Sequence, residues 1–402
     1  MKKIIILTYG NLSKHHGGKI TTGLTQVTWQ TANEVNKLNK KNIETKFLTL
    51  NSILYKKNIE HTEVYGFNIR SFMFFCLKNI KLVLATLISA INIKINYRLK
   101  FIKTFVELLF FEYGYDQIKP SVFHCHGVFD SLLLSHCSFF KKVETIITIH
   151  GITGQDLKII DSNFNRKIEL EVTNIKFSRI VFVATLLKNQ WKEYYGEISS
   201  PVDVILNGVD TSVFYNRRLT PKLSKKIDLV CIGTLNERKG QIRILEALEK
   251  CENVDCFKII FIGEAISEEY LKFLKNKSKS IINSDIEFNG YLNSKEIAFI
   301  LNQSDYMILP SSSEGFGLVY IESILCGTPV IIPKDLPLAQ EPGILSKNNS
   351  IYLKDSTSNS ILNLLNELKN NYKFCSEEVS KSCTHLSTKN NISNYLKIYS
   401  QF

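Results

Sequence analysis

Short runs of β-branched and other apolar residues alternate along the chain with longer stretches in which apolar positions recur at helical spacing. Continuous apolar runs predict strands that are buried on both faces, as in parallel sheets covered by helices. In the first half we predict strands at Lys3–Tyr9, Glu44–Leu50, Ser121–Cys125, Thr145–Ile149, Arg179–Ala184 and Val202–Leu206. In the second half we predict them at Asp228–Ile232, Lys258–Ile262, Ile286–Phe288, Tyr306–Leu309 and Pro329–Ile332. Two such sets predict two doubly wound α/β domains.

The length of the chain and one polar segment predict where these domains meet. A chain of 402 residues is too long for one ordinary core. Residues 216–226 are polar and basic, contain a proline, and precede a new buried strand. We therefore predict a first domain over 1–215 and a second over 216–385. The remaining residues, 386–402, contain a final apolar helix, Ile392–Phe402, for which we expect packing back on the first domain.

Composition is that of a folded globular protein, with 44% hydrophobic and 22% charged residues. Nine cysteines lack the paired spacing of zinc sites and small disulfide scaffolds, and several, such as Cys231 and Cys326, lie in apolar runs. This distribution predicts buried free thiols in a reducing cytoplasm. The apolar run that follows Met1 is too short for a signal peptide and predicts a buried strand.

The formal net charge of +12 is concentrated early in the chain, because residues 1–120 contain 18 Lys or Arg and 7 Asp or Glu. A basic domain favours an anionic partner, such as lipid head groups, a phosphorylated acceptor or nucleic acid. No nucleic-acid recognition module is visible in the sequence, so we expect no nucleic-acid partner. Compositional drift is the alternative, since the chain is rich in Ile, Asn and Lys throughout.

The most apolar stretch, Leu82–Ile93, has 12 residues, too few to cross the roughly 30 Å of a bilayer's hydrocarbon as a helix. The wider segment 72–111 mixes Phe, Leu and Ile with several lysines and arginines. Two interpretations are open for it. A basic, aromatic-rich helical stretch can lie on an anionic membrane surface, or it can pack on its own domain with the lysines in water.

The strongest local signal, in residues 311–331, predicts a strand end, a glycine-containing loop, a helix, a turn and a strand. Gly315 and Gly317 let the backbone approach a ligand closely. A helix beginning near Gly317 directs free N–H groups and its positive dipole end toward an anion. Glu314 and Glu322 suit sugar hydroxyls, which donate hydrogen bonds to carboxylate oxygens. A surface helix with two solvated glutamates is the alternative.

Arg238 and Lys239 form a second signal after the strand Asp228–Ile232. A guanidinium beside an ammonium suits a diphosphate leaving group, whose charge grows as a glycosidic bond breaks. A purely structural role is less attractive, because positive charge at a helix start opposes the helix dipole. The sequence contains no Asp-x-Asp triplet for a divalent cation, so we expect neither a metal nor a cofactor.

Both segments resemble those of the retaining GT-B glycosyltransferases, specifically glycosyltransferase family 4, through its Glu-x7-Glu motif and its strand-end basic pair. The resemblance implies two Rossmann-like domains facing a central cleft, the second of which binds a UDP- or GDP-sugar donor. In the family the first Glu contacts the donor sugar, loop amides lie near sugar and phosphate, the basic pair neutralises the diphosphate, and the second Glu binds the ribose. The donor-binding positions implied are Gly233, Arg238, Lys239, Glu314, Gly315, Phe316, Gly317, Leu318 and Glu322.

Weaker matches lie in the first half. Gly17 and Gly18 resemble the glycine pair that the family places over the donor phosphates. His150 resembles the family's active-site histidine near the reacting centre, and His126 resembles positions that line the acceptor site. The catalytic residues implied by the resemblance are therefore His150, Arg238, Lys239 and Glu314.

His124, Cys125 and His126 end one strand and raise the alternative of a metal site. Side chains alternate along a strand, so both histidines face one way and Cys125 the other. No fourth ligand is evident from the sequence, so a metal here is disfavoured.

The segment 334–343 departs from the family pattern, because the usual glycine pair is missing there although Glu341 aligns with the family's Pro-Glu. The resemblance is strong over 202–333, moderate over 1–25 and 121–210, and absent over 51–115, where acceptor specificity is expected to lie. It implies a retaining transferase that moves a sugar from a nucleotide-sugar to a glycan or lipid-linked acceptor, in bacterial surface polysaccharide synthesis.

Two other classes of function remain open. A relative that is not a transferase, such as a phosphorylase or epimerase, would consume donor without glycosylating an acceptor. A non-catalytic scaffold of a membrane glycan assembly complex would not need both glutamates and the Arg-Lys pair. For the transferase we expect a cytoplasmic location, peripheral to the inner face of the membrane.

Overall fold

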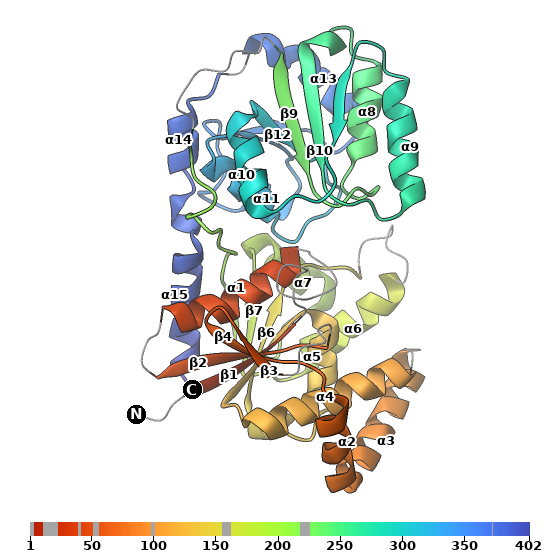
Figure 1. Ribbon diagram of the computed structural model, residues 1–402, viewed down its shortest axis with the longest axis vertical. Helices are drawn as coiled ribbons and strands as arrows, with labels where there is room; N and C mark the ends of the chain where they lie inside the picture. Colours follow the sequence, from red (N-terminus) through yellow and green to blue (C-terminus); the bar gives the residue numbers. More distant parts are fainter. Residues whose placement is uncertain are drawn as a thin grey trace. The chain divides into compact units, whose positions relative to one another are not determined.

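The computed structural model describes residues 4–10, 23–38, 42–50, 56–97, 101–154, 162–217, 226–371 and 373–402. The chain divides into two compact units (Figure 1). Unit 1 comprises Met1–Gly208 together with Thr388–Phe402, and unit 2 comprises Val209–Ser387.

Unit 1 is built on a sheet of eight described strands in the order β3-β4-β2-β1-β5-β6-β7-β8. Its strands are β1 (Ile4–Tyr9), β2 (Ile43–Leu48), β3 (Lys56–Ile59), β4 (Thr62–Tyr65), β5 (Val122–His126), β6 (Glu144–Ile149), β7 (Arg179–Phe182) and β8 (Val202–Val204). All described pairs are parallel except β3 with β4. Chain order reverses between β1 and β5, which is the switch point where open α/β sheets bind ligands.

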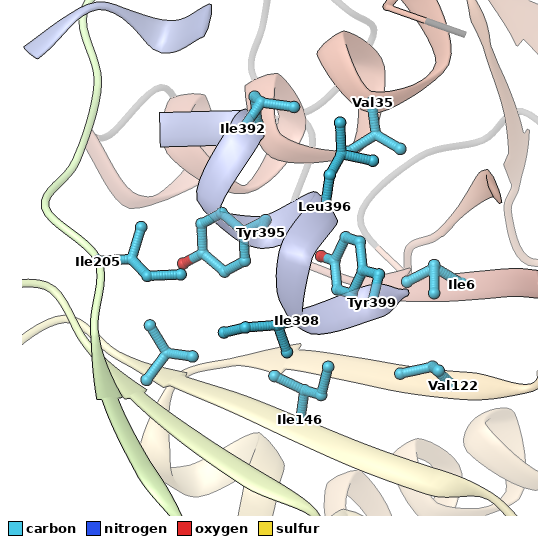
Figure 2. Close-up of a cluster of buried hydrophobic side chains, with 11 residues drawn as sticks. Ile6, Val35, Val122, Ile146, Ile205, Ile392, Tyr395, Leu396, Ile398 and Tyr399 are labelled. Atoms are coloured by element: carbon cyan, nitrogen blue, oxygen red, sulfur yellow. The ribbon is translucent and has the colours of Figure 1, made fainter. Parts of the chain in front are cut away.

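The described helices of unit 1 are α1 (Gly23–Lys37), α2 (Ile69–Lys78), α3 (Ile80–Tyr97), α4 (Phe101–Ile118), α5 (Val128–Ser135), α6 (Ser162–Asn174), α7 (Thr185–Tyr195) and α15 (Thr388–Tyr399), with a 3₁₀ turn at Phe140–Lys142. One sheet face packs on α15 and on Val35 of α1, in the apolar cluster shown in Figure 2. On the other face, Phe111 of α4 stacks edge-on against Tyr9. Alternate residues of a strand face opposite sides of the sheet, so central strands such as β1 and β7 are apolar at most positions.

Unit 2 is built on a sheet of six described strands, all parallel, in the order β11-β10-β9-β12-β13-β14. The strands are β9 (Ile227–Ile232), β10 (Phe257–Ile262), β11 (Asp285–Phe288), β12 (Tyr306–Ile308), β13 (Val330–Pro333) and β14 (Ser350–Leu353). The described helices are α8 (Gln241–Glu249), α9 (Glu268–Lys279), α10 (Ser294–Gln303), α11 (Leu318–Leu325), α12 (Pro337–Gln340), α13 (Ser358–Asn371) and α14 (Ser376–Lys381). Short 3₁₀ turns occur at Val254–Cys256 and Thr384–Leu386. Chain order reverses here between β9 and β12.

All eleven strands predicted from the apolar runs are present, with ends within two residues of the prediction wherever the chain is described. The sequence reading missed β3, β4 and β14. Strand β3 has the sequence Lys-Lys-Asn-Ile and lies at the sheet edge, and the other two have four residues each, so none forms a continuous apolar run.

The units part at different residues from the predicted boundary at 215/216. The segment Val209–Tyr215 belongs to unit 2, where the Val209 N–H donates to the Leu386 carbonyl at 2.9 Å and Phe214 is buried. The last helix begins at Thr388 and belongs to unit 1, where the Asn391 side chain donates to the Leu206 carbonyl at 2.6 Å.

Candidate functional site

The chemistry-bearing residues of unit 2 follow the two strands at its switch point. Gly233 comes directly after β9, and Ser311 follows β12, the neighbouring strand. The carboxyl ends of adjacent parallel strands meet at one sheet edge, so the two following loops share one place.

Lys239 and Glu314 form an ion pair across these two loops, with the Lys239 ammonium donating to Glu314 Oε1. The Arg238 guanidinium lies 3.5 Å from the same oxygen. The side chain of Arg238 is 38% exposed, whereas those of Lys239 and Glu314 are 14% and 10% exposed. Three predicted residues are therefore brought together, with the Arg238 cation partly free to meet an anion from solvent.

The backbone of the two loops is tied together by hydrogen bonds. The Arg238 carbonyl accepts from the Ser312 N–H at 2.8 Å, and the Arg238 guanidinium donates to the Ser313 carbonyl at 2.5 Å. Arg243 in α8 donates to the Pro310 carbonyl at 2.5 Å and to the Arg238 carbonyl at 3.3 Å. Gly240 has φ 81°, and a Cβ there would lie 2.6 Å from the Pro310 oxygen.

Sequence reasoning missed Arg243, which positions Arg238 through its carbonyl. A signal for it existed, because a cation in the first turn of α8 opposes the helix dipole and so calls for another partner. Its partners are three carbonyl groups, those of Glu237 and Arg238 in the preceding loop and that of Pro310 in the facing loop.

The N-terminus of α11 completes this edge of unit 2. Gly317 precedes the helix with φ 82°, and a Cβ there would lie 2.8 Å from the Tyr320 ring. Gly315 and Leu318 are partly exposed, whereas Phe316 is buried, with 3% of its surface exposed. The unpaired N–H groups of a helix start are an anion-binding arrangement.

Glu322 lies in the same helix but makes no ion pair with the basic residues. Burial raises the pKa of its carboxyl group from 4.5 to about 7. Within the described residues no hydrogen bond reaches this carboxyl group. A desolvated carboxylate without a partner can be stabilised by hydroxyl donors from a ligand.

In unit 1, His126 and His150 form a hydrogen-bonded pair, with 3.0 Å between His126 Nδ1 and His150 Nε2. Burial lowers the pKa of His150 to about 4, and burial with two neighbouring histidines holds that of His126 well below its usual value. Both rings are therefore neutral near pH 7. His126 is 2% exposed and contacts His150 through this hydrogen bond. The Nε2 atom of His126 has no partner among the described residues.

His124 belongs to a separate network with the C-terminal helix. Its Nδ1 lies 2.7 Å from the Tyr399 hydroxyl and its Nε2 lies 2.8 Å from the Thr148 hydroxyl. Burial lowers the pKa of His124 to about 3. Among the described residues there is no group of three or more His, Cys, Asp or Glu side chains that could hold a metal ion.

Glu169 of α6 holds the loop that follows His150, and no motif in the sequence pointed to this role. Its carboxylate accepts from the Thr153 N–H at 2.8 Å, from the Gly154 N–H at 3.0 Å, and from the Tyr195 hydroxyl. Glu169 is 1% exposed, so these hydrogen-bond donors replace the water that would otherwise solvate its carboxylate. The loop segment three and four residues after His150 is therefore held by a residue that lies 19 positions after His150 in the chain.

Two further predicted features remain. Gly17 and Gly18 lie outside the described residues, so the predicted glycine pair stays a prediction. In the divergent segment 334–343, Glu341 follows α12 and is buried, with 8% of its surface exposed.

Two protein-family models match the chain. The model described as glycosyl transferases group 1 matches residues 216–378, and the model described as glycosyltransferase family 4 matches residues 84–213. The first falls in unit 2, and the second falls mainly in unit 1.

Curated relatives carry related descriptions. An uncharacterized glycosyltransferase of Methanocaldococcus jannaschii is 26% identical over 67% of this chain and 71% of its own length. The O-antigen biosynthesis glycosyltransferase WclY of Escherichia coli is 26% identical over 55% of this chain and 62% of its own length. With others the chain spans about half the relative's length, as with 52% for the glycogen synthase of Mycobacterium tuberculosis.

Solved structures match over the whole chain. The sucrose-phosphate synthase of Thermosynechococcus elongatus superposes with a TM-score of 0.74 at 12% identity, covering 100% of this chain and 99% of that one. HepE of Anabaena, in complex with UDP and glucose, superposes with a TM-score of 0.72 at 14% identity, covering 100% of both chains. At these identities the likeness concerns the fold alone.

Proposed function

This chain is a glycosyltransferase of family 4 with the GT-B fold, and from this premise we propose that it moves a sugar from a nucleotide-sugar to a glycan or lipid-linked acceptor with retention of configuration. Unit 2 takes the donor and unit 1 takes the acceptor. The observation that carries the proposal is the meeting of Arg238, Lys239 and Glu314 at the β9/β12 switch point.

The donor's diphosphate is neutralised by Arg238 and Lys239 and by the N–H groups at the start of α11. Lys239 is already paired with Glu314, so donor binding redistributes one existing ion pair instead of burying a new isolated charge. The negative charge that develops on the leaving phosphate is then met by fixed cations, which is where electrostatic catalysis is largest. HepE of Anabaena, which shares this fold, is known in complex with UDP and with UDP-glucose, which favours a UDP-sugar.

The two glutamates take the hydroxyl groups of the donor. Glu314 lies in the loop beside the diphosphate site and meets the transferred sugar. Glu322, whose raised pKa reflects burial without a partner, gains hydroxyl donors from the ribose. His150 stays neutral near pH 7 and donates a hydrogen bond to the sugar, with its ring oriented by His126.

Retention follows, on this proposal, from attack on the same face from which the nucleotide departs, with the departing phosphate accepting the acceptor's proton. A role in bacterial surface polysaccharide synthesis is favoured by the relative named for O-antigen biosynthesis and by the basic first part of this chain. No metal and no cofactor enter the proposal.

A donor panel tests the proposal directly. Calorimetric binding of UDP-, GDP- and ADP-sugars should give saturable binding for one base, and the anomeric configuration of the product should match that of the donor by NMR. Inversion would contradict the retaining mechanism. Consumption of donor without a glycosylated acceptor would favour a phosphorylase or epimerase, and absence of all donor binding would favour a non-catalytic scaffold.

A further inference from the structure

Exposed apolar side chains gather on one part of unit 1. Of the 20 large hydrophobic residues found exposed in the described part of the chain, nine lie between residues 69 and 102. They are Ile69, Met73, Phe74, Leu77, Ile80, Leu84, Ile88, Ile91 and Ile102, with exposures from 41% to 75%. Single exposed apolar residues are ordinary, but a gathering of this kind marks an interaction surface.

The spacing of these residues follows the helices. In α2 the exposed residues Ile69, Met73 and Leu77 recur every four positions, and in α3 Ile80, Leu84 and Ile88 do the same. Residues four apart share one face of a helix, so each helix turns an apolar face to solvent. We call the eight residues Ile69, Met73, Phe74, Leu77, Ile80, Leu84, Ile88 and Ile91 the α2–α3 face.

The opposite side of each helix is also apolar and packs on unit 1. Phe75 of α2 is 3% exposed, and its ring lies 5.6 Å from that of Tyr113 in α4. In α3, Ala90 and Ile93 are fully buried. A surface helix normally has an apolar side toward the core and a polar side toward water. The α2–α3 face departs from this rule, because its residues are apolar although they are exposed to water.

The charges around the α2–α3 face have one sign. From Val64 to Val106 the sequence contains seven Lys or Arg and no Asp or Glu. Among them, Arg70, Lys78 and Lys81 are exposed on the two helices. A protein partner with an apolar groove needs no such charge bias, whereas anionic lipid head groups attract basic residues beside a buried apolar face.

The geometry favours lying on a bilayer over crossing it. No single helix among the described residues is long and apolar enough to cross a membrane. The pair Ile69–Lys78 and Ile80–Ile93 passes that test only jointly and is bent by 99°. The buried sides of these helices are already taken by unit 1, so one face alone remains for lipid.

We propose that the α2–α3 face docks unit 1 on an anionic lipid bilayer, with its apolar side chains among the acyl chains and Arg70, Lys78 and Lys81 among the head groups. This docking stands apart from the donor site, which lies in unit 2. It would bring the acceptor-binding unit to a lipid surface, where a lipid-linked acceptor is found.

Cosedimentation of the whole chain with vesicles tests the proposal. The chain should bind vesicles of equal parts phosphatidylcholine and phosphatidylglycerol, and bind those of phosphatidylcholine alone much less. The double variant Phe74→Ser/Leu77→Ser changes two side chains that are 70% and 75% exposed, and should bind at least about tenfold more weakly. Its matched control, Phe273→Ser/Ile282→Ser on unit 2, should bind like the wild type.

A charge pair of variants separates lipid from other occupants. Lys78→Glu/Lys81→Glu should lose binding to the anionic vesicles, and Lys295→Glu/Lys347→Glu, in exposed positions of unit 2, should keep it. Vesicle binding that is equal in all four variants would overturn the proposal. So would a dimer in lipid-free sedimentation that Phe74→Ser/Leu77→Ser converts to monomer, because a second copy would then cover the α2–α3 face.

Donor binding measured in the same variants keeps the two proposals distinguishable. Variants of the α2–α3 face should bind the nucleotide-sugar as the wild type does. If the wild type bound vesicles but no nucleotide-sugar, the result would contradict the proposed function and leave the membrane-docking proposal standing.

Discussion

Lys239 forms an ion pair with Oε1 of Glu314, and the Arg238 guanidinium lies 3.5 Å from the same oxygen. Two cations around one anion leave a net positive charge at the β9/β12 edge. A surface ion pair adds little stability, but fixed charges at a largely buried site act strongly on a charged ligand. We therefore expect these residues to matter more for the proposed donor binding than for the stability of unit 2.

Lys239→Ala and Glu314→Ala should each lower the transfer rate at least about 100-fold, which corresponds to roughly 3 kcal/mol of lost transition-state stabilisation. Initial rates with the donor found in the panel measure this. Lys277→Ala is the matched control, because it breaks the exposed Lys277–Glu249 ion pair of the same unit, 2.5 Å long. Rates near wild type in both site variants would refute the site assignment.

Glu322→Gln should stabilise the fold while weakening the binding of the nucleotide. Burial raises the pKa of Glu322 from 4.5 to about 7, so the folded state binds its proton more tightly than the unfolded state does. Stability from this group is therefore present below about pH 4.5 and is lost as pH rises to about 7. At pH 8 the Gln variant should be more stable by about 1–3 kcal/mol, and at pH 4 equal.

Urea unfolding of the Glu322→Gln variant and the wild type at the two pH values measures this difference. Glu367→Gln, at an exposed position of α13 in the same unit, provides the comparison for a carboxylate that faces solvent. An equal stability difference at both pH values would show that the Glu322 carboxyl group is solvated in the folded protein.

Helix α15 shows how one element completes a domain far from it in sequence. Ile392, Tyr395, Leu396, Ile398 and Tyr399 are at most 5% exposed and cover Ile6, Val122 and Ile146 of the unit 1 sheet (Figure 2). The Tyr395 hydroxyl lies 3.2 Å from the Thr148 hydroxyl, and Tyr399 holds His124. Without α15, the apolar face of the unit 1 sheet that contains Ile6, Val122 and Ile146 would be exposed to water.

A chain that ends at Ser387 should lose most of the stability of unit 1. Burial of a large apolar side chain contributes about 1.5–3 kcal/mol, so losing five approaches the whole stability of a typical domain. Amide hydrogen exchange should then be fast in β5 and β6 and stay slow in β9 and β12. A chain that lacks only Gln401 and Phe402, both exposed, should keep wild-type protection everywhere.

At the scale of the whole molecule, the chain forms two units of related architecture, each built on a mainly parallel sheet. Unit 2 is continuous in sequence, whereas unit 1 is completed by the C-terminal helix. Each unit has a switch point, at β1/β5 and at β9/β12. The predicted cation–carboxylate group lies at the switch point of unit 2, and the histidine pair lies at the carboxyl ends of β5 and β6 of unit 1, where His126 ends β5 and His150 follows β6.

Addition of UDP should slow amide exchange chiefly in the loops after β9 and β12, residues 233–240 and 311–318. Ligand binding stabilises the state that binds, and local openings that destroy the site are suppressed first. Hydrogen exchange followed by mass spectrometry of the whole chain measures the change. Slower exchange confined to the edge strand β3 or to α9 would place the nucleotide elsewhere.

The sequence by itself determined the two doubly wound sheets. Parallel strands buried on both faces are mostly apolar, and the polar positions in strands such as β2 and β11 are few enough to leave the pattern readable, so eleven strands could be found from local pattern alone. Strands β3, β4 and β14 could not be found in this way, because each has only four residues and includes polar ones. Strands β3 and β14 lie at sheet edges, and β4 lies between β3 and β2. The motifs around Glu314 and Lys239 could also be found from local sequence, because a glycine loop and the helix start after it consist of adjacent residues.

Only the tertiary structure decided which side chains meet. Lys239 and Glu314 lie 75 residues apart, His126 and His150 lie 24 apart, and His124 and Tyr399 lie 275 apart. Glu169 likewise became visible only through its neighbours, and packing alone decided which apolar side chains of α2 and α3 are exposed to solvent. Burial, pairing and solvent exposure depend on the packing of distant segments, and local spacing carries no information about that packing.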